Sequence, residues 1–535
     1  MPVSVRPHRL CVIAVALTLL VGVAPAAASA KSRHTIALAP RNAAALAAYA
    51  QSVTTPGSAL YHHFLSVGQF ARRFGRSGAQ LHAVRTRLAA HGLRTGRISA
   101  NGLTLSVSGS AAGATAALPR ALVQGVIGSG GAAPSASVIV HRSRRRAGVP
   151  GATADLSSTG ASAPCSAATA LAASAGAHTA DQIASAYGLD SFQAAGDEGH
   201  GVTVALYELE PFSPADIAAY QACYGTAAPV TTTLVDGGAG TGPGSGEAAM
   251  DIEDVIGLAP QASIDVYEGP ATRAGAYQTY SRIVSDDTAQ VISTSWGMCE
   301  ALAGAAPAAA ENTLFEEAAV QGQTVVAAAG DEGSDDCGIG IRSVDDPASQ
   351  PWVTGVGGTT RPGADLVWND AQGATGGGVS HLWGRPTYQD ANALATTSRC
   401  RGGASACREV PDISADADPA SGYVAVYDGG WATVGGTSVA APTLAAYAAL
   451  AEASTACGGH RIGFLNPLLY RAPAADFGDV NQGQNGFGGV AGVAAGSGYD
   501  MASGLGAPTA ALGGALCAGW VGSGSHSSQR GPTPT

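Results

Sequence analysis

The chain has 535 residues, which is enough for two or three domains and a large hydrophobic core. Hydrophobic residues make up 46% of the sequence and glycines number 74, whereas only 13% of the residues are charged, well below the usual share. This composition argues against a nucleic-acid binder, which needs a basic face, and suits an extracellular protein with a densely packed core.

The first 30 residues have the pattern of a secretory signal peptide. Arg6 and Arg9 form a basic start, an apolar run covers 10–23, and Ala28-Ser29-Ala30 fits an A-x-A cleavage site. A membrane anchor is the alternative, but the apolar run is too short to span a bilayer. We therefore expect a secreted protein with no membrane contact once residues 1–30 are removed.

Residues 31–145 are predicted to form a small α/β domain. Helices are expected at 43–49, 67–74 and 80–91, and strands at 103–109 and 136–140. An Arg-, Gly-, Ala-, Ser- and Pro-rich stretch follows from about residue 141, which is typical of a flexible segment open to proteolysis. Within it we predict a linker over 146–177 and a processing site near Arg144–Arg146.

The charges divide sharply between the two parts of the chain. Residues 31–150 hold fifteen Lys or Arg and no Asp or Glu, whereas residues 151–535 hold eleven basic and 39 acidic residues, a net charge of −28. The parts should attract each other at neutral pH and lose that attraction as carboxylates protonate near pH ~4. We expect the N-terminal part to inhibit the rest until acid releases it; a generic basic stalk is the alternative.

Strands and helices alternate in the region 178–520, which we assign to a single domain. Strands are expected at 202–209, 263–269, 289–296, 324–330 and 352–358, and helices at 214–224, 313–321 and 437–454. This alternation predicts a doubly wound, mostly parallel α/β sheet, in which ligands bind at the carboxyl ends of the strands. Residues 521–535 are rich in Gly, Ser and Pro and are expected to be a disordered tail.

Eight cysteines remain once Cys11 leaves with the signal peptide, and an even number in an exported protein favours disulfides. Sequence does not prove their connectivity. The simplest pairing is sequential: Cys165–Cys223, Cys299–Cys337, Cys400–Cys407 and Cys457–Cys517. No C-x-x-C pair is present, which argues against a zinc site.

The sequence GGTSVAAP at 435–442 places a candidate nucleophile, Ser438, at the start of a long apolar helix. In the first turn of a helix, exposed N–H groups and the helix dipole favour a developing negative charge. Pro442 is tolerable there because it falls near the helix start. A serine that merely caps the helix is the alternative.

A nucleophilic serine needs a base. Only His200, just before a strand, is a mild candidate among the histidines beyond residue 150. Glu247 and Asp251 are better candidates, because their i,i+4 spacing puts both carboxyls on one face of a helix. Such a pair can share a proton and titrate as a unit, which suits acid–base catalysis at low pH. The alternative is a solvated acidic face.

Asp331 follows an apolar strand in the sequence VVAAAGDEG, where an α/β active site collects its groups. A carboxylic acid that stays protonated can donate a hydrogen bond to an oxyanion. A turn-forming aspartate beside Gly333 is the alternative.

These motifs, taken together, resemble the sedolisins, the serine-carboxyl peptidases, and among them the kumamolisins. The matching segments follow the order of that family: GEAAMDIE (246–253), STSWG (293–297), AAGD (328–331), PDISADADPASGY (411–423) and GGTSVAAP (435–442). YHHFLSVGQFARRFG at 61–75 is similar to the family's activation pro-domain. The resemblance implies a subtilisin-like catalytic domain after a ferredoxin-like pro-domain that inhibits it.

The resemblance also implies a role for each candidate residue. Ser438 would attack the peptide carbonyl, Glu247 would take and return its proton, and Asp251 would orient Glu247. Asp331 would stabilise the oxyanion together with the Ser438 N–H. Trp296 matches a tryptophan near the catalytic network, although a simple core aromatic is equally consistent with the sequence.

One structural calcium ion is implied by a similar loop near the C-terminus. Its ligands would be carboxylates of Asp479 and Asp500 and backbone carbonyls of Val480, Gly496 and Gly498, an all-oxygen set of the kind calcium prefers. A glycine-rich surface loop is the alternative. Where the family commonly has isoleucine this chain has Val480, which leaves the carbonyl unchanged.

The expected activity is endopeptidase cleavage of protein or peptide substrates by a monomer that is made as a zymogen. The alternatives are a tripeptidyl-peptidase and a non-catalytic secreted binding module on the same scaffold. The four expected catalytic positions, Ser438, Glu247, Asp251 and Asp331, are all filled, which favours an enzyme.

Overall fold

The computed structural model describes residues 33–136, 139–146, 163–360, 362–363, 365–390, 400 and 406–517. The predicted signal peptide, the predicted tail and residues 147–162 of the predicted linker lie outside this range. In the part of the chain that the structure describes, no helix has the length and apolar character needed to cross a membrane.

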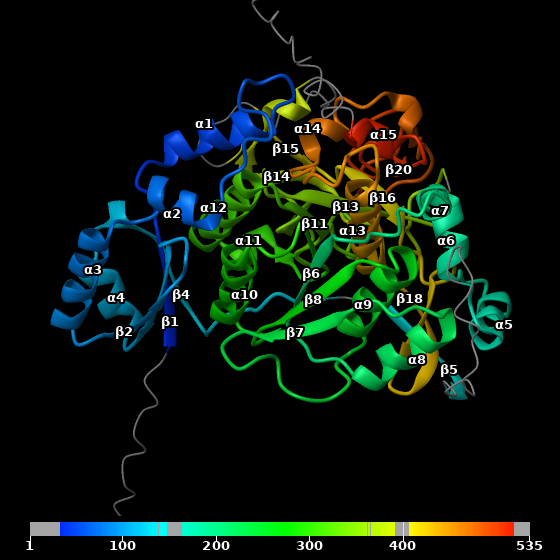
Figure 1. Cartoon of the computed structure of the whole chain (residues 1–535), viewed down its shortest axis with the longest axis horizontal. Helices are drawn as coiled ribbons and strands as arrows, with labels where there is room; N and C mark the ends of the chain where they lie inside the picture. Colours follow the sequence, from blue (N-terminus) through cyan, green and yellow to red (C-terminus); the bar gives the residue numbers. More distant parts are fainter. Residues whose placement is uncertain are drawn as a thin grey trace, which may run out of the picture.

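The N-terminal region forms a separate four-stranded antiparallel sheet in the order β2-β3-β1-β4, with helices packed against it (Figure 1). This order confirms the ferredoxin-like arrangement. Its elements are β1 (Arg33–Leu38), α1 (Ala43–Thr54), α2 (Val67–Arg73), α3 (Gly78–Ala90), β2 (Arg94–Ile98), β3 (Thr104–Ser108), α4 (Ala111–Ala117) and β4 (Val123–Gly128). Ser66 with Gln69 and Ser77 with Gln80 form capping boxes that fix where α2 and α3 begin.

The larger region is built on a seven-stranded, fully parallel sheet in the order β16-β13-β11-β9-β6-β8-β7. This confirms the doubly wound α/β fold. The strands are β6 (Thr203–Glu208), β7 (Val230–Leu234), β8 (Ser263–Glu268), β9 (Val291–Thr294), β11 (Thr324–Ala328), β13 (Thr354–Thr359) and β16 (Ile413–Asp416).

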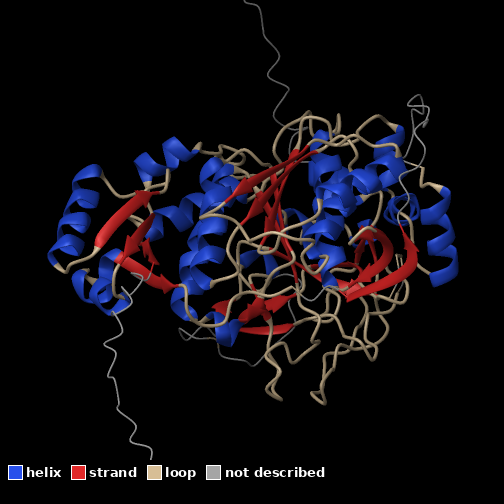
Figure 2. Cartoon of the chain, turned by 90° about the horizontal axis from the view of Figure 1, so that it is seen from below, coloured by secondary structure: helices blue, strands red, loops and turns tan. Residues whose placement is uncertain are grey.

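Helices cover both faces of the parallel sheet (Figure 2). Helices α9 (Glu247–Leu258) and α13 (Thr437–Ala453) share one hydrophobic core with the sheet, and α10 (Arg273–Asp286) and α12 (Ala305–Gln321) share the other. The other helices in this region are α5 (Ser166–Ala175), α6 (Ala180–Tyr187), α7 (Leu189–Ala194), α8 (Pro214–Tyr224), α11 (Glu300–Ala303), α14 (Asn466–Leu469) and α15 (Leu512–Cys517).

Short strands build the edges of the larger region. They are β10 (Met298–Cys299), β12 (Asp345–Asp346), β14 (Gly378–Gly384), β15 (Cys407–Val410), β17 (Tyr423–Tyr427), β18 (Gly430–Gly435), β19 (Phe477–Gly478) and β20 (Ala507–Pro508). The hairpin of β17 and β18 runs directly into α13 and therefore leads the chain to Ser438.

The sheet of the N-terminal region rests on α10 and α12, with α1 also against α12 (Figure 1). The hydrogen bonds that join the surfaces include Ser281 to Thr104 at 2.8 Å, Gln278 to Thr35 at 2.9 Å and the amide of Asn101 to the carboxyl of Glu317 at 2.7 Å. None of the ion pairs among the described residues joins the two regions, although the two parts carry opposite net charges.

Strand β5 (Ile139–Arg146) differs from the expectation for this segment. We expected a strand at 136–140 to belong to the N-terminal sheet and the chain to be flexible from about residue 141. Instead, β5 pairs with β18 and completes a three-stranded sheet, β17-β18-β5, in the larger region. The open edge of β18 supplies backbone partners that the sequence of β5 alone does not reveal. Helix α5 likewise lies within the predicted linker.

The sequential disulfide pairing is confirmed for all four bonds: Cys165–Cys223, Cys299–Cys337, Cys400–Cys407 and Cys457–Cys517. The first of them ties α5 to the end of α8, so residues beyond Cys165 are covalently part of the larger region.

Candidate active site

The predicted catalytic residues come together at the carboxyl edge of the parallel sheet. Ser438 lies in the first turn of α13, Glu247 and Asp251 lie on one face of α9, and Asp331 follows β11. All four are buried. Gly436, at φ 109°, makes the tight turn before α13, a conformation that L-residues with a side chain rarely adopt.

Burial and mutual repulsion dominate the electrostatics of the two α9 carboxyls. Burial raises the pKa of Glu247 well above its usual value, and the neighbouring Asp251 raises it further, whereas a hydrogen bond with Ser438 opposes the shift. Burial raises the pKa of Asp251 to about 8. Carboxyls this close cannot all ionise, so they titrate as one unit and retain protons well into the neutral range.

A third buried carboxyl, Glu208 at the end of β6, completes this cluster and was missed from the sequence. Its pKa is raised well above its usual value by burial, then by Asp251 and Glu247. The indole Nε1 of Trp296 donates a 2.8 Å hydrogen bond to Glu208 Oε2. Glu208 lies at the carboxyl end of a predicted strand, and this position is the signal that could have identified it.

Ser295 connects the carboxyl cluster to the nucleophile's own turn. Its hydroxyl lies 3.0 Å from Asp251 Oδ1 and 3.1 Å from the backbone oxygen of Ser438. That oxygen needs such a partner because Pro442, four residues later in α13, has no N–H to offer it. Pro442 is thus more than tolerated near the start of α13, because it leaves the Ser438 carbonyl without a helical N–H partner.

Asp331 is held against the start of α13 by one of its two oxygens. Oδ1 accepts hydrogen bonds from both the backbone N–H and the hydroxyl of Thr437, each at 2.7 Å. Oδ2 is buried and has no hydrogen-bond partner in the described residues. Burial raises the pKa of Asp331 to about 6, so below that pH the carboxyl carries a proton that Oδ2 can donate.

Histidines stand apart from this site. His178 contacts the carbonyl of Ser421, His381 lies near the carbonyl of Arg342, and His200 is exposed. No histidine of the described chain lines the cavity that holds Ser438 and Asp331, and His526 lies outside the described residues. The geometry therefore offers carboxyls, and not an imidazole, as proton acceptors for Ser438.

The chain's own segment after β4 runs through the cleft beside Ser438. Ser135 pairs with Gly297 in antiparallel fashion through two backbone hydrogen bonds of 2.9 and 3.0 Å. Ile139 and Val140, a few residues on, pair with Gly435 and Val434 of β18. The described residues thus pair with the chain after β9 and with β18 just before α13, and a cavity of about 300 Å³ lies beside Ser438.

Comparison with known proteins identifies the two regions. Residues 20–123 match the family described as Pro-kumamolisin, activation domain, and residues 230–456 match the subtilase family. Sedolisin of Pseudomonas sp. (strain 101) is 31% identical over 528 residues, which cover 90% of this chain and 86% of that protein. The chain belongs to the sedolisin family. Its N-terminal region is accordingly an activation pro-domain.

Two further comparisons support membership of the sedolisin family. Kumamolisin of Bacillus sp. (strain MN-32) is 39% identical over 333 residues, which cover 58% of this chain and 59% of kumamolisin, less than two thirds of its length. The solved structure of Pseudomonas sedolisin complexed with two molecules of pseudo-iodotyrostatin superposes with a TM-score of 0.53 at 30% identity, over 60% of this chain and 94% of that one. A tripeptidyl-peptidase of Aspergillus fumigatus is also similar, at 31% identity over 349 residues.

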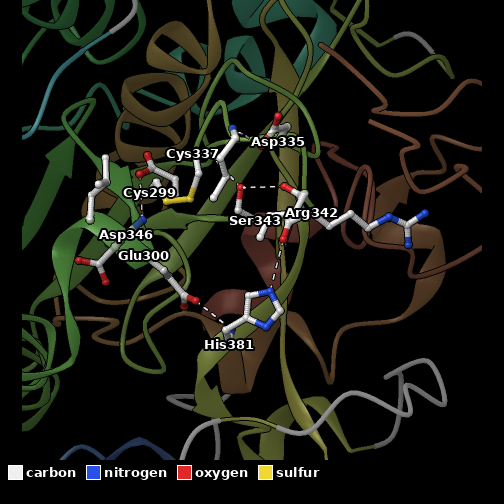
Figure 3. The surroundings of a disulfide bond; sticks show 12 residues. Cys299, Glu300, Asp335, Cys337, Arg342, Ser343, Asp346 and His381 are labelled. Atoms are coloured by element: carbon white, nitrogen blue, oxygen red, sulfur yellow. Dashed lines mark hydrogen bonds between the residues drawn. A yellow bond between two sulfur atoms is a disulfide. The ribbon is translucent and has the colours of Figure 1, made fainter. Parts of the chain in front are cut away.

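An acidic pocket adjoins the nucleophile in this sedolisin-family chain. Asp336 and Asp345 line the same cavity as Ser438, and burial raises the pKa of both, that of Asp336 to about 7. The Cys299–Cys337 disulfide joins β10 to the loop that carries Asp336 (Figure 3). β10 also pairs with β12, so this wall of the pocket is held at several points.

The residues proposed for calcium approach one another in two loops near the C-terminus. Asp479 Oδ1 accepts the N–H of Gly498 at 2.9 Å, and Asp500 Oδ2 accepts the N–H of Gly496 at 2.8 Å. The Val480 oxygen lies 3.1 Å from the Ser503 hydroxyl, which also contacts Asp500. No group of three or more His, Cys, Asp or Glu side chains in the described residues could hold a metal. A cation here would depend on two carboxylates plus carbonyls, a donor set that suits calcium.

Proposed function

We propose that the mature protein is a serine-carboxyl endopeptidase that acts in acid and hydrolyses protein or peptide substrates through an acyl-enzyme on Ser438. The observation that carries this proposal is the buried cluster of Glu247, Asp251 and Glu208 beside Ser438. One negative charge on this cluster is stabilised by hydrogen bonds from Ser438, Ser295 and Trp296. Repulsion opposes further ionisation, so the cluster suits proton transfer at low pH.

In the first half of the proposed reaction, the Ser438 hydroxyl attacks the peptide carbonyl carbon and its proton passes to Glu247. The resulting oxyanion accepts hydrogen bonds from the protonated Asp331 carboxyl and the Ser438 N–H. The C–N bond then breaks, Glu247 returns the proton to the leaving amine, and the acyl group stays on Ser438.

In the second half, Glu247 takes a proton from water, whose oxygen attacks the acyl carbon. Collapse of the second tetrahedral intermediate releases the acid product, and the proton returns to Ser438. Asp251 orients Glu247 throughout and is held in turn by Ser295 and Glu208. The role of Asp331 requires its protonated form, so activity should fall as the pH passes about 6.

Endopeptidase action, and not removal of tripeptides, is favoured by the path of the chain's own segment. Backbone pairing of Ser135 to Gly297 and of Ile139 to Gly435 in β18 supports extended binding of a chain along this cleft. A tripeptidyl site would instead have to close around a free amino group three residues before the cleaved bond.

A basic side chain is the substrate feature that the acidic pocket fits. Asp336 and Asp345 face a cavity shared with Ser438, and the described residues of the occupying segment there are small, Ala132, Ala133 and Ser135. A lysine or arginine would favour ionisation of these carboxyls and form charge-assisted hydrogen bonds with them. Peptides with Lys or Arg at the position that fills the pocket should be cleaved faster than norleucine analogues, and Asp345→Asn should remove the difference.

The pro-domain is proposed to inhibit in cis until it is cut away. Ala132, Ala133 and Ser135 line the cavity that holds Ser438, so a cut after Ser135 is needed to free it. The predicted site at Arg144–Arg146 lies at the end of β5, whereas a cut between Ser135 and Ile139 would fall before that strand. N-terminal sequencing of the mature form distinguishes the two positions. A cut before Cys165 leaves no tethered strand.

Secretion, one structural calcium ion and a monomeric state complete the proposal. Four disulfides favour an oxidising compartment. Calcium would be held by Asp479, Asp500 and the carbonyls of Val480, Gly496 and Gly498, where it would tie two loops together. Nucleic-acid and membrane partners are not expected.

Hydrolysis of casein by the acid-treated wild type and by Ser438→Ala tests the proposed function. We expect cleavage in acid by the wild type only, with product masses that show internal cuts. Products that are all tripeptides would support the tripeptidyl-peptidase alternative. Absence of activity at any pH, with folded protein, would support the non-catalytic binding module instead.

A further inference from the structure

Glu210, in the loop between β6 and α8, reaches the exposed N-terminus of α9. Its carboxylate accepts backbone N–H groups from Ser245 at 2.6 Å, Gly246 at 3.1 Å and Ala248 at 3.3 Å. The N-cap position of α9 is Gly246, which has no side chain to cap the helix. The first turn of α9 therefore takes its cap from a different part of the chain.

We propose that Glu210 is a positioning residue that fixes the start of α9 and sets the pH range over which the catalytic carboxyls ionise. Glu247 is the first residue of α9, so the cap holds the base where Ser438 can reach it. This inference rests on the proposed function, because it assigns Glu210 a role in the same proton transfer.

The negative charge of Glu210 and the dipole of α9 have opposite effects on the pKa of Glu247. The N-terminus of a helix favours a nearby negative charge and would lower the pKa of Glu247. Glu210 places a competing negative charge there, and it contributes to the raised pKa of Glu247, Asp251 and Glu208. The other charged groups that interact with Glu247 from neighbouring elements are Asp331 and Glu208, which are also acidic.

Two substitutions separate the cap from the charge. Glu210→Gln removes the charge but keeps one oxygen, which can still accept the N–H groups of Gly246 and Ala248, whereas Glu210→Ala removes every acceptor. For Glu210→Gln we expect the acid limb of the kcat/KM profile to move to lower pH by about half a unit or more, with a smaller fall in Tm than in Glu210→Ala. Glu210→Ala should lower both Tm and activity. Asp190→Asn, which removes an exposed charge on α7, is the matched control and should change neither.

A wild-type profile in acid that Glu210→Gln leaves unmoved would overturn this inference alone. A wild-type profile centred at neutral pH would instead overturn the proposed function. The two failures are therefore distinguishable in the same set of measurements.

A second, independent observation concerns how the pro-domain docks on the catalytic domain. Phe64, between α1 and α2, lies against two glycines of the catalytic domain, Gly322 and Gly463. A Cβ atom added at these glycines would lie 2.5 Å and 2.9 Å from the Phe64 ring. The neighbouring Leu65 N–H donates to the carbonyl of Val320 at 3.0 Å. The phenyl ring therefore occupies a socket that only glycine can form.

His62 is part of the same docked segment. Its backbone adopts φ 59°, which is rare for a residue with a side chain, and its ring stacks on Tyr61 with centroids 3.6 Å apart. On the catalytic side it meets His460 and the backbone of Ile462. We infer that His62 is an acid-sensitive latch, which holds the pro-domain while neutral and releases it on protonation.

The charges around His62 oppose its protonation in the docked state. Burial, and then the neighbouring His460, lower the pKa of His62 to about 4. A backbone interaction with Ile462 acts in the other direction and raises this pKa. Arg471 from the segment after α14 acts on the stacked Tyr61 and binds the Pro56 carbonyl at 2.9 Å. Glu452 of α13 accepts the N–H of Ile462 at 3.2 Å, and Arg461 beside it forms an ion pair with Asp287 at the end of α10.

The sign of the pH effect follows from these two states. Free histidine has a pKa near 6.5, above the docked value, so the released pro-domain binds the proton more tightly. Docking is at full strength above about pH 6.5 and weakens as the pH falls toward 4. The latch therefore weakens at a higher pH than the attraction between the oppositely charged domains, which is lost only as carboxylates protonate near pH ~4.

Activation time courses of the full-length zymogen test the latch. His62→Asn removes the proton site, so we expect activation at pH 5 to slow by about tenfold or more, with unchanged activity of the mature enzyme. His63→Asn, a change at the exposed neighbour, is the matched control and should activate like the wild type. Should His62→Asn fail to fold, His460→Asn serves instead, because it removes the repulsion and should also move activation to lower pH. Equal activation of both His62→Asn and His63→Asn, or an unchanged pH dependence in His460→Asn, would overturn the latch.

Discussion

The indole of Trp296 and the carboxyl of Glu208 are joined by a 2.8 Å hydrogen bond in the interior of the protein. The two residues lie at the ends of neighbouring parallel strands, β9 and β6, and Glu208 in turn acts on Asp251. The bond therefore links the sheet to the catalytic carboxyls. It explains why a tryptophan in STSWG belongs to the network and is more than a core aromatic.

Trp296→Phe should lower kcat/KM by about tenfold, because a hydrogen bond to a buried charged group is lost. The indole lowers the pKa of Glu208, so its removal should also move the acid limb of the activity profile to higher pH. Steady-state kinetics from pH 3 to 7 measure both effects. Trp352→Phe, at a half-buried tryptophan packed on Phe464, is the control and should leave the profile in place.

Asp331→Asn should extend activity toward neutral pH. The amide oxygen can still accept the two hydrogen bonds from Thr437, and the amide nitrogen donates whatever the pH, whereas the carboxyl donates only below its pKa of about 6. Asp331→Ala should instead lower kcat by about 10²–10³. An upper limb that stays near pH 6 in Asp331→Asn would exclude this carboxyl as the titrating donor.

The protein should be most stable in acid. The folded-state pKa of Asp251, about 8, lies above its unfolded value, so the folded state binds protons more tightly and stability is lost as the pH rises between the two values. Thermal unfolding of Ser438→Ala, which avoids self-digestion, should show Tm falling by about 5 °C or more from pH 5 to 8. Asp251→Asn should flatten this dependence, and a Tm that rises over the same range would contradict the assigned protonation.

Chelation should destabilise the protein if calcium joins the loops of Asp479 and Asp500. We expect EDTA to lower Tm by several degrees and excess calcium, but not magnesium, to restore it. Asp500→Asn should have a low Tm that no longer responds to EDTA. A wild-type Tm that EDTA leaves unchanged would show that these loops are held by their own hydrogen bonds, such as those from Gly496 and Ser503 to Asp500.

Much of the fold follows from local sequence signals. Hydrophobic runs marked the central strands, and Ser213 followed by Pro214 fixed the start of α8, where Ser213 caps the helix in the structure. Strands β1, β2 and β4 were missed. β2 has no fully buried side chain and β4 has one, so their sequences lack the apolar pattern of a core strand.

The candidate site was predictable only where chemistry and spacing coincide. Glu247 and Asp251 were candidates because their i,i+4 spacing puts both carboxyls on one helical face, and the structure buries both. Glu208, Ser295 and Glu210 were not found, because each acts through a contact between segments distant in the chain. The motif PDISADAD holds the fold together and supplies none of the proposed catalytic groups. Its Asp412 forms a fully buried ion pair with Arg408 and accepts a hydrogen bond from the hydroxyl of Tyr470 at 2.8 Å.

The dependence of kcat/KM on pH for the mature wild type and Glu247→Gln tests most directly whether a carboxyl, and not a histidine, is the base. We predict wild-type activity in acid that falls above about pH 6, and a loss of about 10³-fold or more in Glu247→Gln at every pH. Wild-type activity that rises between pH 6 and 7 to a neutral plateau, or a Glu247→Gln variant that keeps its activity, would contradict the account.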